Sequence, residues 1–382
     1  MPASANALRD QVFATPRLLL DAFDEIERTA RLILTTPEIY GTRRIVLVGS
    51  GDSFFAAKAS EMALLSYSGL PIEVRPPLEA GRYHAMLSSE RDLSATLVLA
   101  ISNSGSAARV AEAADLYRRR GAFVLALTKA PKSRLARLAT RTLHLPALPL
   151  PPAPGFGPYV LAIVTLLLIA IRIGEVRLAI TMDEAQALRA KLKATLTGLG
   201  GVIESTDMPA REAAAMIAGR PLAEFVGAGP GMAVAEYGAA KVLEASGHHA
   251  LARELEEWTH LNYFDAQPDQ IVTILPIAAD SVAQSRAVEL LGYMHKLGRA
   301  VVVIGGGASA DTARKQGQQV IAVDDAVPEL WSPLLLSAPL ALIAGYLADA
   351  AGSVYGRGGV GAWSDSADAS TVQQGLLWEP GT

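Results

Sequence analysis

The sequence predicts an α/β protein made of two homologous domains, each a doubly wound parallel sheet. Apolar, strand-like runs alternate with helix-length segments along most of the 382 residues, as in βαβ units. The two halves align with each other at an offset near 178, which pairs Gly49 with Gly227 and Gly121 with Gly298. A repeat of this length indicates a duplicated domain rather than a solenoid. The 51% hydrophobic content is sufficient to fill two cores.

The first half predicts a regular series of strands and helices. Each strand is an apolar run, the first two running into Gly/Ser-rich turns, and the first helix has apolar residues at a spacing of three or four. The elements, in chain order, are a helix over 7–37, a strand at 43–49, a helix over 58–69 that stops at Gly69, a strand at 95–101, a helix over 107–121 and a strand at 121–130.

The middle of the chain separates the two halves. The proline-rich segment 146–158 cannot form a regular helix or a central strand, because proline has no N–H donor. The apolar run 159–171 is about a third shorter than a bilayer span, so we expect a buried core helix over 159–173 and no membrane segment. A long helix over about 183–218 then leads into the second set of βα units.

These observations predict five regions. They are an N-terminal helical lead-in (1–27), a first domain (28–172), a linker helix (173–199), a second domain (200–350) and an irregular Gly/Ser-rich tail (351–382).

Composition excludes several classes of function. The net charge is −4 and no basic block occurs, so we expect no nucleic-acid partner. The 382 residues contain no cysteine, which removes disulfides, thiolate metal sites and a cysteine nucleophile. The N-terminal residues have no charged segment followed by an apolar one, so we expect no signal peptide and a cytoplasmic location.

Two Ser-rich turns end strands of the first domain and precede helices. They are GSGDS (49–53) and SNSGS (102–106). Helix N-termini with Ser hydroxyls can bind a phosphate, here without a lysine. The alternative is that these serines only cap the helices. Neither turn matches the Rossmann or P-loop pattern, and the corresponding turn GAGPG (227–231) has no hydroxyl, so we expect no phosphate in the second domain.

The repeat and the two turns together resemble the sugar isomerase (SIS) domain family, whose fold is flavodoxin-like. The resemblance is greatest to tandem-SIS proteins, namely the isomerase half of glutamine–fructose-6-phosphate amidotransferase and its deglycase and deaminase relatives. It implies a sugar-phosphate ligand and no cofactor. It also implies phosphate-binding residues in both turns, which here are Gly51, Ser53, Ser102, Asn103, Ser104 and Ser106.

The resemblance also implies an acid–base set in the second domain. The family pattern of Lys-x-x-Glu followed by a His sixteen residues later matches Lys241, Glu244 and His260, and Glu257 matches a further acidic position. By this resemblance Glu244 is the base that moves a proton between neighbouring carbons, Lys241 acts on the sugar oxygens, and His260 opens the ring. In the family this His comes from a neighbouring subunit, which implies a homodimer.

Other interpretations of the same residues remain open. A Lys/Glu pair at i, i+3 is commonly a solvated surface pair. Asp52 and Ala107 stand where the family usually has hydroxyl residues, which leaves an altered substrate open. His248 and His249 follow the helix end at Gly247 and are either structural or close to substrate. No histidine and carboxylate spacing predicts a metal site.

The sequence therefore predicts a phosphosugar aldose–ketose isomerase. We expect no glutaminase activity from these residues, because they contain no cysteine, and no imine to the tail, because the last lysine is Lys315. An aminosugar-phosphate deaminase or fructosamine-phosphate deglycase would use the same site. A sugar-phosphate sensor is the alternative of another class. The aromatic residues of the tail (Tyr355, Trp363 and Trp378) cover the site or pack on a partner subunit.

Overall fold

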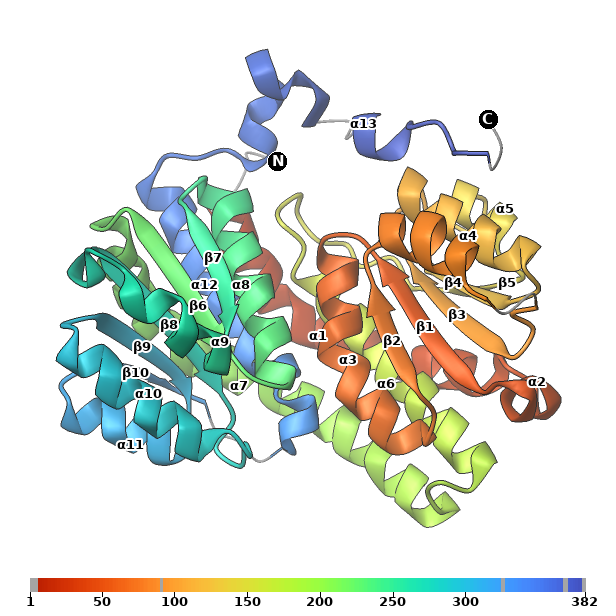
Figure 1. The fold of residues 1–382 in the computed structure, drawn as a ribbon, viewed down its shortest axis with the longest axis horizontal. Coiled ribbons are helices and arrows are strands. Elements are labelled where there is room, and N and C mark those ends of the chain that lie inside the picture. The colour runs from red at the N-terminus through yellow and green to blue at the C-terminus, as the bar shows by residue number, and fades with distance from the viewer. Residues whose placement is uncertain (1–5, 90–91, 324–326, 367–369, 380–382) are drawn as a thin grey trace. The chain divides into compact units, whose positions relative to one another are not determined.

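The computed structural model describes residues 6–89, 92–323, 327–366 and 370–379. It contains two five-stranded parallel sheets with strand orders β2-β1-β3-β4-β5 and β10-β9-β8-β6-β7 (Figure 1). If the second sheet is read from β7 to β10 and the strands of each sheet are numbered in chain order, both sheets have the order 2-1-3-4-5. This is the flavodoxin-like doubly wound order. The predicted fold class and its internal duplication are confirmed.

The first sheet and its helices occupy the first half of the chain. The strands are β1 (Arg44–Gly49), β2 (Ile72–Arg75), β3 (Thr96–Ile101), β4 (Phe123–Thr128) and β5 (Arg141–His144). The helical segments are α3 (Asp52–Ser68), the π-helix η1 (Glu79–Ala85), α4 (Ala108–Arg119), α5 (Arg134–Leu138) and α6 (Gly157–Arg177).

The second sheet repeats this arrangement. Its strands are β6 (Leu222–Gly227), β7 (Ala250–Glu254), β8 (Ile271–Ile277), β9 (Ala300–Gly305) and β10 (Gln319–Ala322). Its helical segments are α8 (Pro230–Ser246), α9 (Leu255–His260), η2 (Asn262–Phe264), η3 (Pro268–Gln270), α10 (Gln284–Lys296), α11 (Gly307–Lys315), η4 (Glu329–Trp331) and α12 (Pro333–Ala350).

Three long or terminal segments stand outside the two sheets. They are α1 (Ala7–Leu32) with α2 (Thr36–Gly41), α7 (Met182–Ala218), and a tail with η5 (Tyr355–Gly359), η6 (Gly361–Ser366) and α13 (Ser370–Gln373). Contacts divide the chain into two units, each holding one sheet. One is Met1–Leu18, Leu150–Gly157 and Thr195–Arg357, and the other is Leu19–Pro149, Pro158–Ala194 and Gly358–Thr382. The domain boundaries expected from the sequence stay a prediction.

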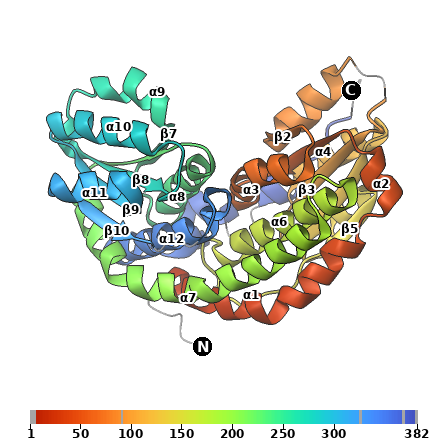
Figure 2. The same cartoon turned by 90° about the horizontal axis from the view of Figure 1, so that it is seen from below.

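Helices cover both faces of each sheet, so the central strands are apolar throughout. On the first sheet, α3 and α6 lie on one face and α4 on the other (Figure 2). The α4 face is filled by Val46, Val98 and Val124 of three neighbouring strands, each 0% exposed. Because both faces of a parallel sheet are buried, its strands show continuous apolar runs instead of alternation. This is why the central strands were predictable.

The apolar helix α6 is a core helix, as expected. In its most apolar window, 83% of the residues are buried within the structure. The apolar helix α12 behaves in the same way, with 72% of the corresponding window buried. Length and apolarity in these two helices therefore result from packing on a sheet.

The structure differs from the prediction in two helices and in an edge strand. The helix predicted over 58–69 begins earlier, at Asp52. The helix expected over 7–37 ends at Leu32, and α2 starts separately after Thr35. Pro37 has no N–H to continue the α1 ladder, and in a continuing helix its ring would clash with the carbonyl of Ile33. Thr35 with Glu38 forms a capping box that starts α2, in which the Thr35 N–H donates to Glu38 Oε2 at 2.7 Å. The sequence also did not predict the edge strand β7 between Gly247 and Glu257, because edge strands of four or five residues carry little periodic signal.

Candidate functional site

The two Ser-rich turns lie at the same edge of the first sheet. β1 and β3 are neighbours, with Gly49 opposite Ile101, so the turns that follow them leave the carboxyl edge side by side. The strand order reverses between β1 and β3, and ligands of doubly wound sheets bind at this reversal. The structure thus brings residues 50–53 and 102–106 to one edge, as the sequence predicted.

Glycines make the first turn possible. A Cβ on Gly49 would lie 2.7 Å from the carbonyl carbon of Ser53, so only glycine lets the strand end approach α3 this closely. Gly51 has φ +54° and precedes α3, and its counterpart Gly229 has φ +52° before α8. L-residues with a side chain rarely adopt this conformation. The repeat is therefore preserved in backbone geometry as well as in strand order.

The second turn is held by backbone hydrogen bonds to the loop after β4. The Lys129 N–H donates to Asn103 O at 3.1 Å, and the Leu135 N–H donates to Gly105 O at 3.1 Å. Ser102 is 5% exposed, and its Oγ accepts from the Gly105 N–H at 3.2 Å. Of the serines in this turn, Ser104 is exposed and Ser106 partly exposed, and their hydroxyl oxygens are 2.7 Å apart.

The serines do not cap the helices that follow them. The N-cap residues of α3 and α4 are Gly51 and Ala107, and neither helix has a side-chain hydrogen bond at its cap. The alternative that these hydroxyls serve only as N-caps is therefore wrong. At the start of α3 the Ser53 N–H donates to Ser50 O at 3.2 Å and the Phe54 N–H donates to Gly51 O at 2.9 Å, so backbone carbonyls rather than serine hydroxyls accept from this turn. Asp52 occupies the first turn of α3, where the helix N-terminus stabilises a carboxylate.

The corresponding edge of the second sheet is occupied by a protein carboxylate. Glu329 accepts a hydrogen bond from the Ser281 hydroxyl at 2.5 Å, and a Cβ on Gly229 would lie 4.0 Å from its Oε1. Ser281 follows β8, and Gly229 follows β6, so Glu329 lies at the reversal of this sheet. A fixed carboxylate there repels an anion, which supports the expectation that the second domain binds no phosphate.

Lys241 and Glu244 lie on α8 and form an ion pair. The Lys241 Nζ and Glu244 Oε2 are 2.5 Å apart, as the i, i+3 spacing predicts. The lysine side chain is only 1% exposed, whereas that of Glu244 is 44% exposed. The Lys241 ammonium also lies 5.5 Å from the centroid of the Tyr237 ring. The pair is thus not a solvated surface pair: its cation is buried and its carboxylate reaches the surface.

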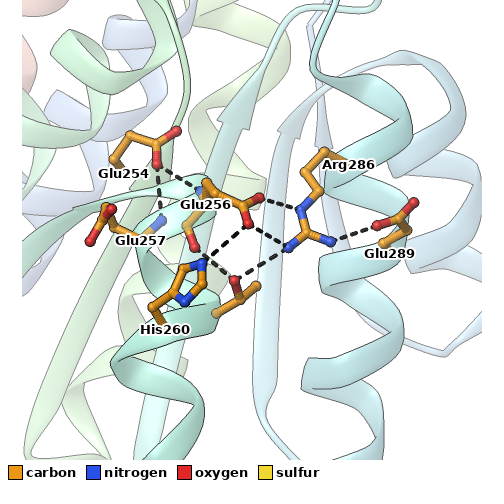
Figure 3. A network of polar contacts seen from close by, with 7 residues as sticks. Glu254, Glu256, Glu257, His260, Arg286 and Glu289 are labelled. Carbon is orange, nitrogen blue, oxygen red and sulfur yellow. Dashed lines mark hydrogen bonds and ion pairs between the residues drawn. The ribbon is translucent and has the colours of Figure 1, made fainter.

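His260 and Glu257 are carried away from α8 by the edge strand β7 and lie on α9. The His260 side chain is 67% exposed, and its Nε2 lies 3.5 Å from Glu256 Oε1 (Figure 3). Glu256 also pairs with Arg286 at 2.6 Å, while the Glu257 carboxylate lies outside this network (Figure 3). Among the described residues, no hydrogen bond or ion pair joins Glu244 to His260 or Glu257. Glu256 was not among the site residues predicted from the sequence, although its i, i+4 spacing from His260 was the available signal.

A buried ion pair fixes the position of α9. Glu224 and Arg299 are both fully buried, with Arg299 Nη1 2.7 Å from Glu224 Oε2. The Trp258 indole N–H of α9 donates to the same carboxylate oxygen at 2.6 Å, and Asn262 donates to its other oxygen at 2.5 Å. Burial raises the pKa of Glu224, and Arg299 opposes that shift. Residues on both sides of His260 are therefore attached to the core through Glu224.

The remaining residues selected from the sequence include two histidines after α8 and a tryptophan of the tail. His248 follows α8 and lines a cavity of about 280 Å³, and burial lowers its pKa. His249 is exposed. In the tail, the Trp378 N–H donates to Glu112 of α4 at 2.7 Å, and the Arg82 guanidinium lies 5.6 Å from the centre of the Trp378 indole. Within the described part of the chain, no three His, Asp or Glu residues are grouped as metal ligands would be.

A family model described as the SIS domain matches residues 38–171. The glutamine–fructose-6-phosphate aminotransferase (isomerizing) of Symbiobacterium thermophilum is 29% identical over 350 residues, which cover 91% of this chain and 55% of that protein. The chain thus spans about half the length of the curated relatives that it matches.

Two solved structures share the fold. The C-terminal domain of glucosamine-fructose-6-phosphate aminotransferase from Francisella tularensis has a TM-score of 0.75 at 16% identity, covering 90% of this chain and 95% of that one. The tagatose-6-phosphate ketose/aldose isomerase of Escherichia coli has a TM-score of 0.70 at 14% identity, covering 100% of both chains. At these identities the likeness is one of fold.

Proposed function

We propose that this chain is a SIS-domain protein and a phosphosugar aldose–ketose isomerase, because a SIS-domain model matches residues 38–171 and the chain is 29% identical over 350 residues to a glutamine–fructose-6-phosphate aminotransferase (isomerizing). The substrate's phosphate binds at the Ser-rich edge of the first sheet, and proton transfer uses residues of the second domain. The enzyme is cytoplasmic, requires no cofactor and works as a homodimer.

The burial of Lys241 is the observation that carries this proposal. A lysine ammonium is almost never fully buried unless it is paired, because its desolvation is costly. Here the buried Lys241 pairs with Glu244, whose carboxylate remains 44% exposed and open to a ligand. Replacing such a pair with apolar residues commonly costs no stability, so stability alone does not explain it. A chemical role of the Glu244 carboxylate explains why the pair is present.

The proposed mechanism gives each group one step. In the open-chain aldose, the Glu244 carboxylate removes the proton from C2, next to the C1 carbonyl, and returns it to C1 of the enediol. The Lys241 ammonium stabilises the negative charge that develops on the sugar oxygens and assists the transfer of the C2 hydroxyl proton to O1, which leaves a hydroxyl at C1 and the carbonyl at C2. His260 protonates the ring oxygen to open the cyclic sugar, and Glu257 lies beside it on α9 as a further acidic group.

We place His260 in the site of a neighbouring copy. Its side chain is 67% exposed and contacts Glu256 rather than Glu244. The segment that follows exposes Leu261, Tyr263 and Phe264, and exposed apolar groups of this kind are typical of a subunit contact. A two-fold dimer would use this contact twice and complete two equal sites.

The test is isomerisation in deuterium oxide, followed by NMR, with a panel of hexose, pentose and aminohexose 6-phosphates. We expect deuterium at C1 or C2 without loss of nitrogen. The Glu244→Gln variant should lose turnover by about a hundredfold or more, since the amide cannot accept the proton. Release of ammonia would instead identify a deaminase, and cleavage of a sugar–amine adduct would identify a deglycase.

Glu204→Gln is the matched control, because Glu204 is an exposed carboxylate on α7. It should turn over substrate like the parent protein. Equal activity of the Glu244→Gln variant would contradict the mechanism. Binding of a sugar phosphate with no turnover of any panel member would favour a sensor over an enzyme.

A further inference from the structure

A cationic loop lies beside the second Ser-rich turn. A cavity of about 510 Å³ is lined by Ser104, Ser106, residues 130–133 of the loop between β4 and α5, Arg134 at the start of α5, and Gln373. Two of these residues are cations, Lys132 and Arg134, and none of the described residues that line the cavity is acidic. The volume is typical of a small-molecule site.

The loop is attached to the turn at both of its ends. Lys129 and Leu135 donate backbone hydrogen bonds to Asn103 and Gly105, as described above. The space between is closely packed, since a Cβ on Gly105 would lie 2.1 Å from the Ser133 hydroxyl oxygen. Gly105 itself has φ +66°. The hydroxyls of the turn and the cations of the loop are therefore held in one arrangement.

Both cations are available on the surface of this arrangement. Lys132 is exposed, and its backbone oxygen accepts from Arg137 at 2.6 Å, which orders the loop. Arg134 is partly buried and donates through Nη1 to Gly375 O of the tail at 3.0 Å. A guanidinium has five N–H donors, so this bond leaves others for a ligand.

We propose that Lys132 and Arg134 form the cationic side of the phosphate site, where they neutralise a phosphate monoester whose oxygens accept hydrogen bonds from Ser104 and Ser106. This inference rests on the proposed function. It also accounts for Ala107, which offers no hydroxyl: the loop supplies charge in place of that missing donor. The ligand class is a phosphorylated sugar, and the unphosphorylated sugar binds far more weakly.

The test is calorimetric titration with inorganic phosphate and with fructose 6-phosphate. Lys132→Ala and Arg134→Ala should each weaken both ligands about ten- to hundredfold, the usual cost of a hydrogen bond to a charged group. Arg134→Lys should recover part of the loss. Binding should also weaken with added salt, less steeply in the variants. Thermal unfolding of each variant checks that the fold is retained.

Lys129→Ala is the matched control, because Lys129 is in the same loop but does not line the cavity. Its affinity should equal that of the parent protein. Ser104→Ala separates the two proposals. If Ser104→Ala loses phosphate while Lys132→Ala and Arg134→Ala do not, the loop role is overturned and the proposed function stands. If the loop variants lose phosphate but the parent protein converts no sugar phosphate, the proposed function fails and the anion site stands. No phosphate binding by the parent protein overturns the site.

Discussion

At the residue scale, the residues that were selected by their spacing in the sequence differ in how far their side chains are buried. Lys241 and Glu244 were predicted from a family pattern at i, i+3, and the structure pairs them at 2.5 Å with the lysine buried. His260 was selected by the same pattern, yet its side chain is exposed and pairs with Glu256. Sequence spacing places residues on one face of a helix, but it does not report which of them is desolvated.

Lys241→Met should separate stability from activity. Methionine keeps the apolar stem and removes the buried charge, while Glu244 stays hydrated. We therefore expect the free energy of unfolding to stay level or rise by about 1 kcal/mol. Turnover should fall about a hundredfold or more, because the charge on the sugar oxygens is no longer stabilised. Urea unfolding and steady-state kinetics measure the two effects.

Lys191→Met on the exposed face of α7 is the comparison, and it should change neither quantity by much. A Lys241→Met protein that is fully active would remove Lys241 from the mechanism. One that is strongly destabilised would mean that the pair is structural.

At the element scale, the two domains match each other more closely in backbone geometry than in side chains. β1 and β6 both end in a glycine, whose lack of a side chain lets the following helix approach closely. α3 and α8 both end at a glycine in the left-handed conformation, Gly69 and Gly247. These positions were predictable because backbone geometry tolerates few alternatives there. The cations of the β4–α5 loop were not predicted, since a loop shows no periodicity and its neighbours are set by the fold.

The tail is attached to α4 through Glu112, and this attachment should depend on pH. Burial alone would raise the pKa of Glu112, but hydrogen bonds from Arg82 and from the Trp378 N–H, with the charge of Arg109, lower it below the ordinary 4.5. A lowered folded-state pKa contributes stability above the ordinary value, and that contribution is lost as the pH falls through the lowered value. Protection of residues 375–379 against hydrogen exchange, taken relative to the intrinsic rate at each pH, should therefore fall only below pH 4.5.

Glu112→Gln should release the same segment at neutral pH and abolish the acid dependence of its exchange. Glu289→Gln, an exposed carboxylate on α10, serves as the control and should leave the segment protected. Full protection of residues 375–379 in the Glu112→Gln variant at neutral pH would show that other contacts hold the tail.

At the scale of the whole molecule, the proposed dimer makes a quantitative prediction. Glu244→Gln and His260→Ala should each be inactive alone. If one site takes Glu244 from one copy and His260 from the other, a mixed dimer has one intact site and one doubly altered site. Random mixing of equal amounts should then restore about a quarter of the parent activity.

Kinetic assays after co-unfolding and refolding, with sedimentation to confirm dimers, make this measurement. A mixture that stays inactive, although mixed dimers form, would mean that both residues serve the same chain's site. Substantial activity in either single variant would remove that residue from the mechanism.

The sequence by itself determined the fold class, the duplication, the Ser-rich turns and the position of Lys241 and Glu244 on one helix. Each of these depends on local pattern: continuous apolar strands, glycines of required conformation, and side chains one helical turn apart. Only the tertiary structure decided that Lys241 is buried, that Glu329 occupies the second sheet's edge, and that Lys132 and Arg134 adjoin the Ser-rich turn. Each of those depends on segments distant in the chain, and packing rather than local pattern sets which of them meet.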